Sequence, residues 1–310
     1  MKKVFIDGEA GTTGLRIRDR LAARTDIALV TLPEELRKDA AARKAALNDA
    51  DIAFLCLPDA AAVEAVSMLE NPDTVVLDTS TAHRTDPRFV YGFPELSPQR
   101  AAQIAAAKRI AVPGCHASGF IALIAPLVAQ GLLPSDAALT CHSVTGYSGG
   151  GKKMIAAYGE PTRSPLYAAP RQYGLSQMHK HLPEMTAVCG LQTPPVFCPI
   201  VADFYSGMAV TVPLFARQLA PGATAADVKK ALQAAYSGSV VRYVGEADAD
   251  GFLSAAALSG KDAMEIAVFG NDTRILLTAR YDNLGKGASG AAVECMNLVL
   301  GVDATTGLNL

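Results

Sequence analysis

The first third of the chain alternates short apolar segments with helix-forming segments, and this alternation most strongly constrains the fold. The predicted strands are residues 3–6, 27–32, 51–57, 74–78 and 109–112. The predicted helices carry Leu15, Ile17 and Leu21 or cover residues 35–48, 60–69 and 99–108. Strands separated by helices of this length form a parallel sheet, because right-handed crossovers place the helices on its faces. The fold class is therefore predicted to be α/β.

The pattern changes after about residue 135, where strands dominate. Strands are predicted over residues 138–144, within 196–214, over 240–244, and as a hairpin of 264–269 and 273–281. Two helices accompany them, one over 224–236 that starts with a capping-box pair and one over about 288–300. At ~150 residues per domain, 310 residues predict two domains.

Composition excludes several classes of protein. Lys and Arg number 28 against 30 Asp and Glu, so the basic excess of an extended nucleic-acid surface is missing. No window approaches the ~18 apolar residues of a membrane span, and Asp7 ends the first apolar run too early for a signal peptide. The six cysteines contain no CxxC pair, which predicts a reduced cytoplasmic protein without a metal site.

A glycine-rich turn lies between the first predicted strand and the first predicted helix. It contains Gly8, Gly11 and Gly14, with Thr12 and Thr13 between the last two. Glycines let the backbone approach a pyrophosphate, and the helix N-terminus offers free N–H groups. The spacing is GxxGxxG rather than GxGxxG, but its position predicts a dinucleotide site.

The residues after the second predicted strand bear on the choice of cofactor. An acidic residue at that strand end would bind a ribose hydroxyl and favour NAD, but the strand ends without one. Glu34 and Glu35 come late, and Arg37 and Lys38 follow. The basic pair suits the 2′-phosphate of NADP. An ordinary solvated charge run on a helix would have the same composition.

Cys115 is the candidate nucleophile. It follows Pro113 and Gly114 and precedes an apolar segment, residues 120–128, that is predicted to be a buried helix. A cysteine at a turn just before a helix N-terminus is stabilised as a thiolate, and the nearby N–H groups can bind an oxyanion. The alternative is a small buried apolar side chain.

Tyr173, His179 and His181 are candidates for proton transfer. A thiol nucleophile needs a proton acceptor and donor, and histidine titrates near neutral pH. The two histidines share a face only if their segment is extended. Zinc binding would need further ligands that the spacing does not provide. The alternative is a pair of surface histidines.

Two further glycine-rich stretches are candidate ligand loops. Residues 143–153 end a strand and include Ser143, Gly149 and Lys152, a flexible composition that suits a phosphate or a carboxylate. Residues 283–290, with Asn283 and Gly285, enter the last helix and can offer N–H donors to a cofactor amide. A flexible surface loop and a plain helix cap are the respective alternatives.

These motifs together resemble one family. The segments FIDGEAGTTG, LDTSTAHR, YGFPEL, VPGCHASG, SVTGYSGGGKK, HKHLPE and DNLGKGASG are similar to those of N-acetyl-gamma-glutamyl-phosphate reductases of the shorter variant. The resemblance runs from residue 5 to about 292. It implies a Rossmann-type NADP-binding domain of residues 1–114 and 285–310, and an α+β catalytic and oligomerisation domain of residues 115–284. It also implies a homo-oligomer, a dimer or a tetramer.

The resemblance further implies an activity and the residues that perform it. The family uses NADPH to reduce an acyl phosphate, N-acetyl-glutamyl 5-phosphate, to the semialdehyde in arginine biosynthesis. By this likeness Cys115 forms a thioester and His181, two residues before the Pro-Glu pair, manages the proton. Tyr173 and His179 would support them. Ser143, Gly149 and Lys152 would contact phosphate or substrate.

Two alternatives remain at the level of sequence. Aspartate-semialdehyde dehydrogenase shares the architecture, but that family usually has Asn immediately before its cysteine, where this chain has Gly114. A non-catalytic NADP-sensing protein is the other alternative, and the presence of both Cys115 and His181 argues against it. The longer variant of the reductase usually has Asn at the position of Val112, so the resemblance carries over the cysteine but not the contacts of the residues beside it.

Overall fold

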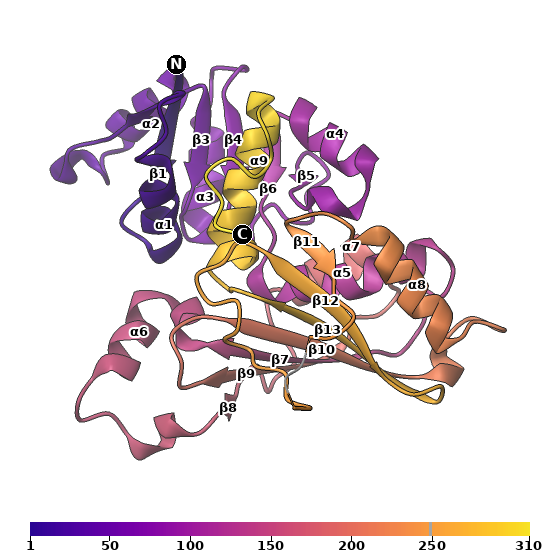
Figure 1. Ribbon diagram of the computed structural model, residues 1–310. Helices are drawn as coiled ribbons and strands as arrows, with labels where there is room; N and C mark the ends of the chain where they lie inside the picture. The colour runs from indigo at the N-terminus through magenta and orange to yellow at the C-terminus, as the bar shows by residue number, and fades with distance from the viewer. Residues whose placement is uncertain (248–249) are drawn as a thin grey trace. The chain divides into compact units, whose positions relative to one another are not determined.

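The computed structural model describes residues 1–247 and 250–310. The chain divides into two compact units (Figure 1). The first contains residues 1–94, 98–113 and 288–308, and the second contains residues 95–97, 114–287 and 309–310. Within the described residues, no helix has the length and apolar character that a membrane span requires.

The first unit is built on a six-stranded sheet with the order β2-β1-β3-β4-β6-β5. All its strand pairs are parallel, which confirms the predicted α/β class (Figure 1). The strands are β1 (Lys2–Asp7), β2 (Ile27–Val30), β3 (Ile52–Leu55), β4 (Val75–Asp78), β5 (Val90–Tyr91) and β6 (Arg109–Ala111). Only the two-residue β5 was not predicted, because it is too short to show periodicity.

Successive residues of a strand point to opposite sides of the sheet, so the apolar strands give it two apolar faces. Helices cover both faces. Val4 and Ile6 of β1 belong to one apolar cluster, and Phe5 belongs to the other. The first cluster includes residues of α1 (Thr12–Leu21), α4 (Pro98–Ala106) and α9 (Gly290–Leu300). The second includes residues of α2 (Ala40–Asp49) and α3 (Asp59–Ser67).

The predicted helix over residues 35–48 is wrong at its start. The structure has a 3₁₀ turn, η1 (Glu34–Leu36), and α2 begins only at Ala40. Asp39 caps α2 because its carboxylate accepts a hydrogen bond from the Ala42 N–H at 2.8 Å. Arg37 and Lys38 therefore lie in the connection before α2, not on a helix face.

The order of the strands creates a crevice at one edge of this sheet. β1 lies between β2 and β3, so the crossovers that leave β1 and β2 run in opposite directions along the sheet. In open α/β sheets such a reversal opens a ligand site at the carboxyl ends of the strands. The glycine turn that follows Asp7 lies at this point.

The second unit contains a mixed seven-stranded sheet with the order β11-β12-β13-β10-β7-β9-β8. Its strands are β7 (Thr140–Gly146), β8 (Arg171–Gln172), β9 (Val196–Ala202), β10 (Met208–Phe215), β11 (Val241–Tyr243), β12 (Met264–Gly270) and β13 (Arg274–Tyr281). The predicted hairpin is confirmed, because β12 and β13 pair antiparallel up to Gly270 and Ile275.

Helices cover one face of this sheet. The long, mostly buried α5 (Cys115–Ala129) packs on β10 and β13 and against α7 (Leu182–Cys189) and α8 (Ala225–Ala235). The predicted capping box of α8, Thr224 with Asp227, is confirmed. Exposed apolar side chains remain on the sheet strands, namely Val196, Phe215 and Leu276.

Two helices of the second unit were not predicted. α6 (Gly151–Gly159) starts within a run of glycines, and α7 has Pro183 at its second position. Both segments have the glycine or proline content that is typical of loops, so the sequence alone did not predict helices there. The predicted helix over residues 288–300 is likewise shortened at its start. A wide turn, η6 (Gly285–Ser289), comes first, and Gly301 ends α9 with φ +69°.

Candidate active site

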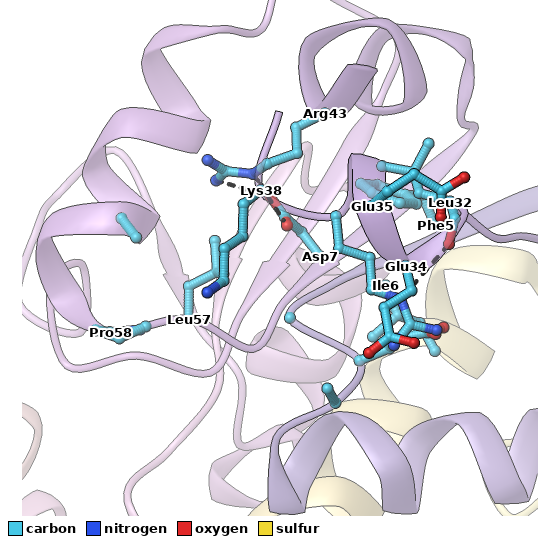
Figure 2. A pocket seen from close by; sticks show the side chains of 15 residues that line it. Phe5, Ile6, Asp7, Leu32, Glu34, Glu35, Lys38, Arg43, Leu57 and Pro58 are labelled. Atoms are coloured by element: carbon cyan, nitrogen blue, oxygen red, sulfur yellow. Dashed lines mark hydrogen bonds and ion pairs between the residues drawn. The ribbon is translucent and has the colours of Figure 1, made fainter. Parts of the chain in front are cut away.

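A cavity of about 650 Å³ lies at the carboxyl ends of the first strands of the first unit (Figure 2). Its wall contains the end of β1, the glycine turn, the connection after β2 and the start of the segment after β3. The lining residues are Phe5, Ile6, Asp7, Gly8, Glu9, Ala10, Leu32, Glu34, Glu35, Arg37, Lys38, Arg43, Leu57, Pro58 and Ala61. The cavity coincides with the crevice that the strand order predicts for a nucleotide.

The glycine turn packs closely against neighbouring backbone, as its composition predicts. Gly8 has φ +86°, and a Cβ on it would lie 2.3 Å from the backbone oxygen of Cys56. A Cβ on Gly14 would lie 2.6 Å from the backbone oxygen of Gly8. Gly11 is the N-cap of α1 and supplies no side-chain cap, so the first-turn N–H groups of the helix, including those of Thr12 and Thr13, face the turn.

Charged side chains line the same cavity. A guanidinium nitrogen of Arg37 lies 2.7 Å from a carboxylate oxygen of Glu9. Lys38 also lines the wall, so both predicted basic residues reach the cavity (Figure 2). Sequence reasoning missed the pairing with Glu9, because nothing in the local pattern links a residue of the glycine turn to one after β2.

A buried ion pair is part of this wall. Arg43 of α2 contacts the Asp7 carboxylate at 3.0 Å (Figure 2). It also contacts the Glu64 carboxylate at 3.2 Å. Burial raises the pKa of Asp7, and the guanidinium opposes that shift. Removing one partner would leave a buried charge without compensation. The pair thus fixes the end of β1 against α2, beside the glycine turn.

Cys115 is the first residue of α5, with Gly114 as N-cap, and not a turn residue before the helix as predicted. The Gly114 N–H donates to the buried carboxylate of Glu184 in α7 at 3.1 Å. The Cys115 carbonyl accepts a hydrogen bond from the Tyr281 hydroxyl at the end of β13. The cysteine backbone is thus held from two sides, and its side chain has the helix N-terminus that stabilises a thiolate.

Other thiols in the chain are poor nucleophiles. Burial raises the pKa of Cys56 to about 12, because a charged thiolate is costly in an apolar environment. Burial also raises the pKa of Cys141 and of Cys189. Cys115 and Cys198 are both partly exposed, but Cys198 lies within β9 and has no helix N-terminus.

His179 and His181 lie together because their segment turns, so an extended segment is not needed to bring the two rings to one side. Their ring centroids are 4.7 Å apart, and the His181 N–H donates to Nδ1 of His179 at 3.2 Å. His181 is the N-cap of α7 and is 5% exposed. The ring centroid of Tyr173 lies 6.0 Å from that of His179. The three predicted polar groups therefore form one cluster.

His116 lies in the middle of this cluster, and sequence reasoning did not select it. Its ring is 5.6 Å from both His179 and His181, centroid to centroid. Nδ1 lies 2.6 Å from the Ser143 hydroxyl, and Nε2 lies 2.6 Å from the Tyr173 hydroxyl. Burial, together with the nearby His179, lowers the pKa of His116 to about 3. Its position directly after Cys115 was the available signal.

The predicted ligand loop over residues 143–153 is more ordered than its composition indicates. The segment continues from β7 into a 3₁₀ turn, η3 (Tyr147–Gly150), and then into α6. Ser143 is fully buried and contacts His116, which favours a supporting role over a substrate contact. Gly149 and Lys152 are exposed.

In the second predicted ligand loop, Asn283 and Gly285 contact other residues of the second unit. The buried Asn283 side chain accepts from the Gly207 N–H at 2.9 Å and donates to the Ser148 hydroxyl at 3.0 Å. A Cβ on Gly285 would lie 2.1 Å from the Lys261 backbone oxygen. These contacts hold neighbouring loops of the second unit together.

Comparisons with known proteins agree with this arrangement. Family profiles described as the NAD binding domain and the dimerisation domain of semialdehyde dehydrogenase match residues 22–104 and 115–283. The fold is similar to aspartate semialdehyde dehydrogenase II of Vibrio cholerae, with TM-score 0.72, 16% identity and coverage of 97% and 98% of the two chains. It is also similar to the Francisella tularensis enzyme, with TM-score 0.74, 14% identity and coverage of 97% and 100%. The family profiles, one of which matches more than half of the chain, place the protein in the semialdehyde dehydrogenase class, and the fold agrees with them.

Relatives with higher sequence identity show which family within this class the chain belongs to. An N-acetyl-gamma-glutamyl-phosphate reductase of Rhizobium johnstonii is 48% identical over 305 residues, which cover 96% of this chain and 98% of the relative. An N-acetyl-gamma-glutamyl-phosphate reductase 2 of a Nostoc species is 45% identical over 318 residues, which cover 99% of each. The chain belongs to the N-acetyl-gamma-glutamyl-phosphate reductase family, and the resemblance in its motifs is confirmed.

Proposed function

We propose that this chain reduces N-acetyl-glutamyl 5-phosphate with NADPH to N-acetyl-glutamate 5-semialdehyde and phosphate, as a step of arginine biosynthesis. One observation carries the proposal: Cys115 begins α5 beside a cluster of histidines, in a chain that is 48% identical to a reductase of this name. A partly exposed cysteine at a helix N-terminus is the group that acyl transfer to sulfur needs.

The two domains predicted from the sequence, whose bounds are close to those of the two compact units, divide the work. Residues 1–114 and 285–310 would bind the nucleotide, and residues 115–284 would bind the acyl phosphate. Gly8, Gly11 and Gly14, with the first-turn N–H groups of α1, fit the pyrophosphate. Arg37 and Lys38 fit the 2′-phosphate, because both line the same cavity. NADPH, when bound, supplies the hydride.

The Cys115 thiolate opens the reaction. Its sulfur attacks the acyl carbon, and the phosphate leaves with the electron pair of the carbon–oxygen bond, so that a thioester forms. The N–H groups at the start of α5 stabilise the negative charge that develops on the acyl oxygen. Gly149 and Lys152 are exposed on the segment after β7, which suits contact with the departing phosphate.

His181 manages the proton in the second half of the reaction. After hydride addition to the thioester carbon, the oxyanion collapses to the aldehyde and the carbon–sulfur bond breaks. The sulfur leaves as thiolate, and an imidazole close to it can hold or return a proton. His179 and Tyr173 support His181 through the contacts of the cluster.

The second unit also suits association with a second copy of the chain. Its profile is that of a dimerisation domain, and its sheet carries the exposed apolar residues Val196, Phe215 and Leu276. Exposed apolar residues on a sheet mark contact surfaces when they are grouped. We also assign the protein to the cytoplasm, where a catalytic thiol stays reduced.

A spectrophotometric assay tests this function in the reverse direction. Purified protein, NADP⁺, phosphate and N-acetyl-glutamate 5-semialdehyde should produce NADPH, and aspartate semialdehyde should produce far less. Cys115→Ala should remove the activity. A preference for aspartate semialdehyde would assign the related dehydrogenase activity instead. NADPH binding without turnover of either aldehyde would identify a non-catalytic sensor.

A further inference from the structure

The hydroxyl of Tyr281, at the end of β13, is inserted into the first turn of α5. It accepts a hydrogen bond from the Gly119 N–H at 3.0 Å and donates one to the Cys115 carbonyl. Cys115 and Gly119 are four residues apart, so these are the two groups that a regular α-helix would pair with each other. The phenol can reach them because residue 119 is glycine, since a Cβ there would lie 2.7 Å from the phenol oxygen.

Neighbouring hydrogen bonds show which donors remain at the start of α5. The Gly114 N–H donates to the Glu184 carboxylate at 3.1 Å, and the Ser118 N–H donates to the Gly114 carbonyl at 2.9 Å. The His116 N–H lies in the first turn of α5, where N–H groups have no acceptor within the helix. It is therefore one of the donors that can bind the acyl oxygen in the proposed reaction.

The His116 N–H and the Cys115 carbonyl belong to one peptide group. This group is planar and trans, so its N–H points in the direction opposite to its C=O. The C=O is directed along the helix to the Tyr281 hydroxyl, so the N–H is directed out of the N-terminal end of α5, where Cys115 lies. A rotation of the carbonyl turns the N–H with it. The buried phenol, held also by Gly119, therefore fixes the direction of the N–H.

We propose that Tyr281 is a positioning residue that aims the His116 N–H at the acyl oxygen by holding the other end of the same peptide group. Without the phenol, the Cys115 carbonyl and the Gly119 N–H can bond directly, so the peptide group turns and neither group is left unpaired. The inference rests on the proposed function, because the acyl oxygen is that of its thioester-forming step. It assigns a role in that step to a side chain that acts through the backbone.

Two reactions of the Cys115 thiolate separate this role from an effect on the sulfur. p-Nitrophenyl acetate acylates the thiolate through a tetrahedral oxyanion and loses p-nitrophenolate, whereas iodoacetamide alkylates it by loss of iodide, without an oxyanion. Tyr281→Phe should lower the rate of acylation by about 10–100-fold, as expected for a misdirected oxyanion donor. The rate of alkylation and its pH dependence should stay nearly constant. Equal losses in both reactions, or an unchanged rate of acylation, would overturn the proposal.

Tyr236→Phe is the matched control for a loss of stability. Tyr236 is also buried, and its hydroxyl donates to another carbonyl of α5, that of Ala122, at 2.7 Å. Ala122 lies about two turns after Cys115, so this variant should lower the melting temperature but leave the rate of acylation unchanged. A loss of acylation in Tyr236→Phe as large as that in Tyr281→Phe would show that both phenols act through stability alone, and would overturn the proposal.

Gly119→Ala is a second variant, which keeps the phenol. Its Cβ would displace the hydroxyl from the Cys115 carbonyl, so acylation should fall and alkylation should not. Melting temperatures show which variants are folded in the assays, and if one of the two is unfolded the other decides. Neither reagent needs the nucleotide or the acyl phosphate, so these rates decide the role of Tyr281 even if the reductase assay of the wild type fails.

Discussion

The guanidinium of Arg37 lies 2.7 Å from the carboxylate of Glu9, on the wall of the nucleotide cavity. The carboxylate is 10% exposed and the guanidinium 38%, so the pair is only partly screened by solvent. A 2′-phosphate at this wall would therefore compete with Glu9 for the same guanidinium. If Arg37 holds the 2′-phosphate as proposed, the affinity for NADPH depends on Glu9, a residue of the glycine turn.

Glu9→Gln should tighten NADPH binding by roughly 2–5-fold, the range expected for release of a partly exposed ion pair. The amide keeps the size of the side chain but removes the charge that repels phosphate. Isothermal titration with NADPH and with NADH measures the effect, and the NADH affinity should stay nearly constant. Weaker NADPH binding in this variant would show that Glu9 places Arg37 for the phosphate and does not compete with it.

Replacing both Arg37 and Lys38 by Ala should weaken NADPH binding by about tenfold or more, because charge-assisted hydrogen bonds to the phosphate are lost. NADH lacks that phosphate, so its affinity should change little. Alanine at the exposed Lys2, which lies outside the cavity, is the control. Equal losses for both cofactors would mean that the basic pair does not read the 2′-phosphate.

Cys115→Ser should abolish turnover and leave NADPH binding intact, because an alcohol at neutral pH lacks the nucleophilicity of a thiolate. Iodoacetamide should label Cys115 before the other thiols. Burial opposes the ionisation of Cys56, for example, and raises its pKa to about 12. Peptide mapping after brief alkylation reports the order. Cys198→Ser is the matched control, and activity in Cys115→Ala would contradict a covalent mechanism.

His181→Asn should lower kcat by about 10²–10⁴-fold, as expected for the loss of a positioned acid or base. His179→Asn should lower kcat by less, because His179 contacts His181 and has a supporting role in the proposed mechanism. His181 is 5% exposed and precedes α7, so His181→Asn is also expected to lower the stability of the fold. Melting temperatures must therefore accompany the rates. A larger loss of kcat in His179→Asn than in His181→Asn would assign the acid or base role to His179.

The buried His116 should make stability depend on pH. Its pKa is about 3 in the folded chain against 6.5 for an ordinary imidazole, so below pH 6.5 only the unfolded chain binds the proton. The contribution of the neutral His116 to the free energy of unfolding is fully present above pH 6.5. It is lost as the pH falls towards 3, by up to about 1.4 kcal/mol per pH unit. Urea unfolding at pH 7 and pH 5 should show the wild type losing about 2 kcal/mol more than His116→Gln. An equal loss of unfolding free energy in the wild type and in His116→Gln would contradict a neutral, buried imidazole.

Local patterns in the sequence determined the first sheet and the candidate nucleophile. Period-two and period-3.6 apolar spacing is set within a few residues, so the strands up to β4 and the capping box of α8 were predictable. The glycine turn was predictable for the same reason, since strand, glycine and helix follow one another directly. Cys115 was visible because Pro113, Gly114 and the apolar helix are its immediate neighbours.

Only the tertiary structure decided which distant side chains meet. The contacts of His116 with Ser143 and Tyr173 join residues 27 and 57 positions apart. The Asp7–Arg43 pair spans 36 positions. No local spacing encodes such contacts, because they depend on which strands pair and which helix faces pack together. The sequence therefore determined the chemical groups that the protein has available, and the packing of its sheets and helices decided which of them work together.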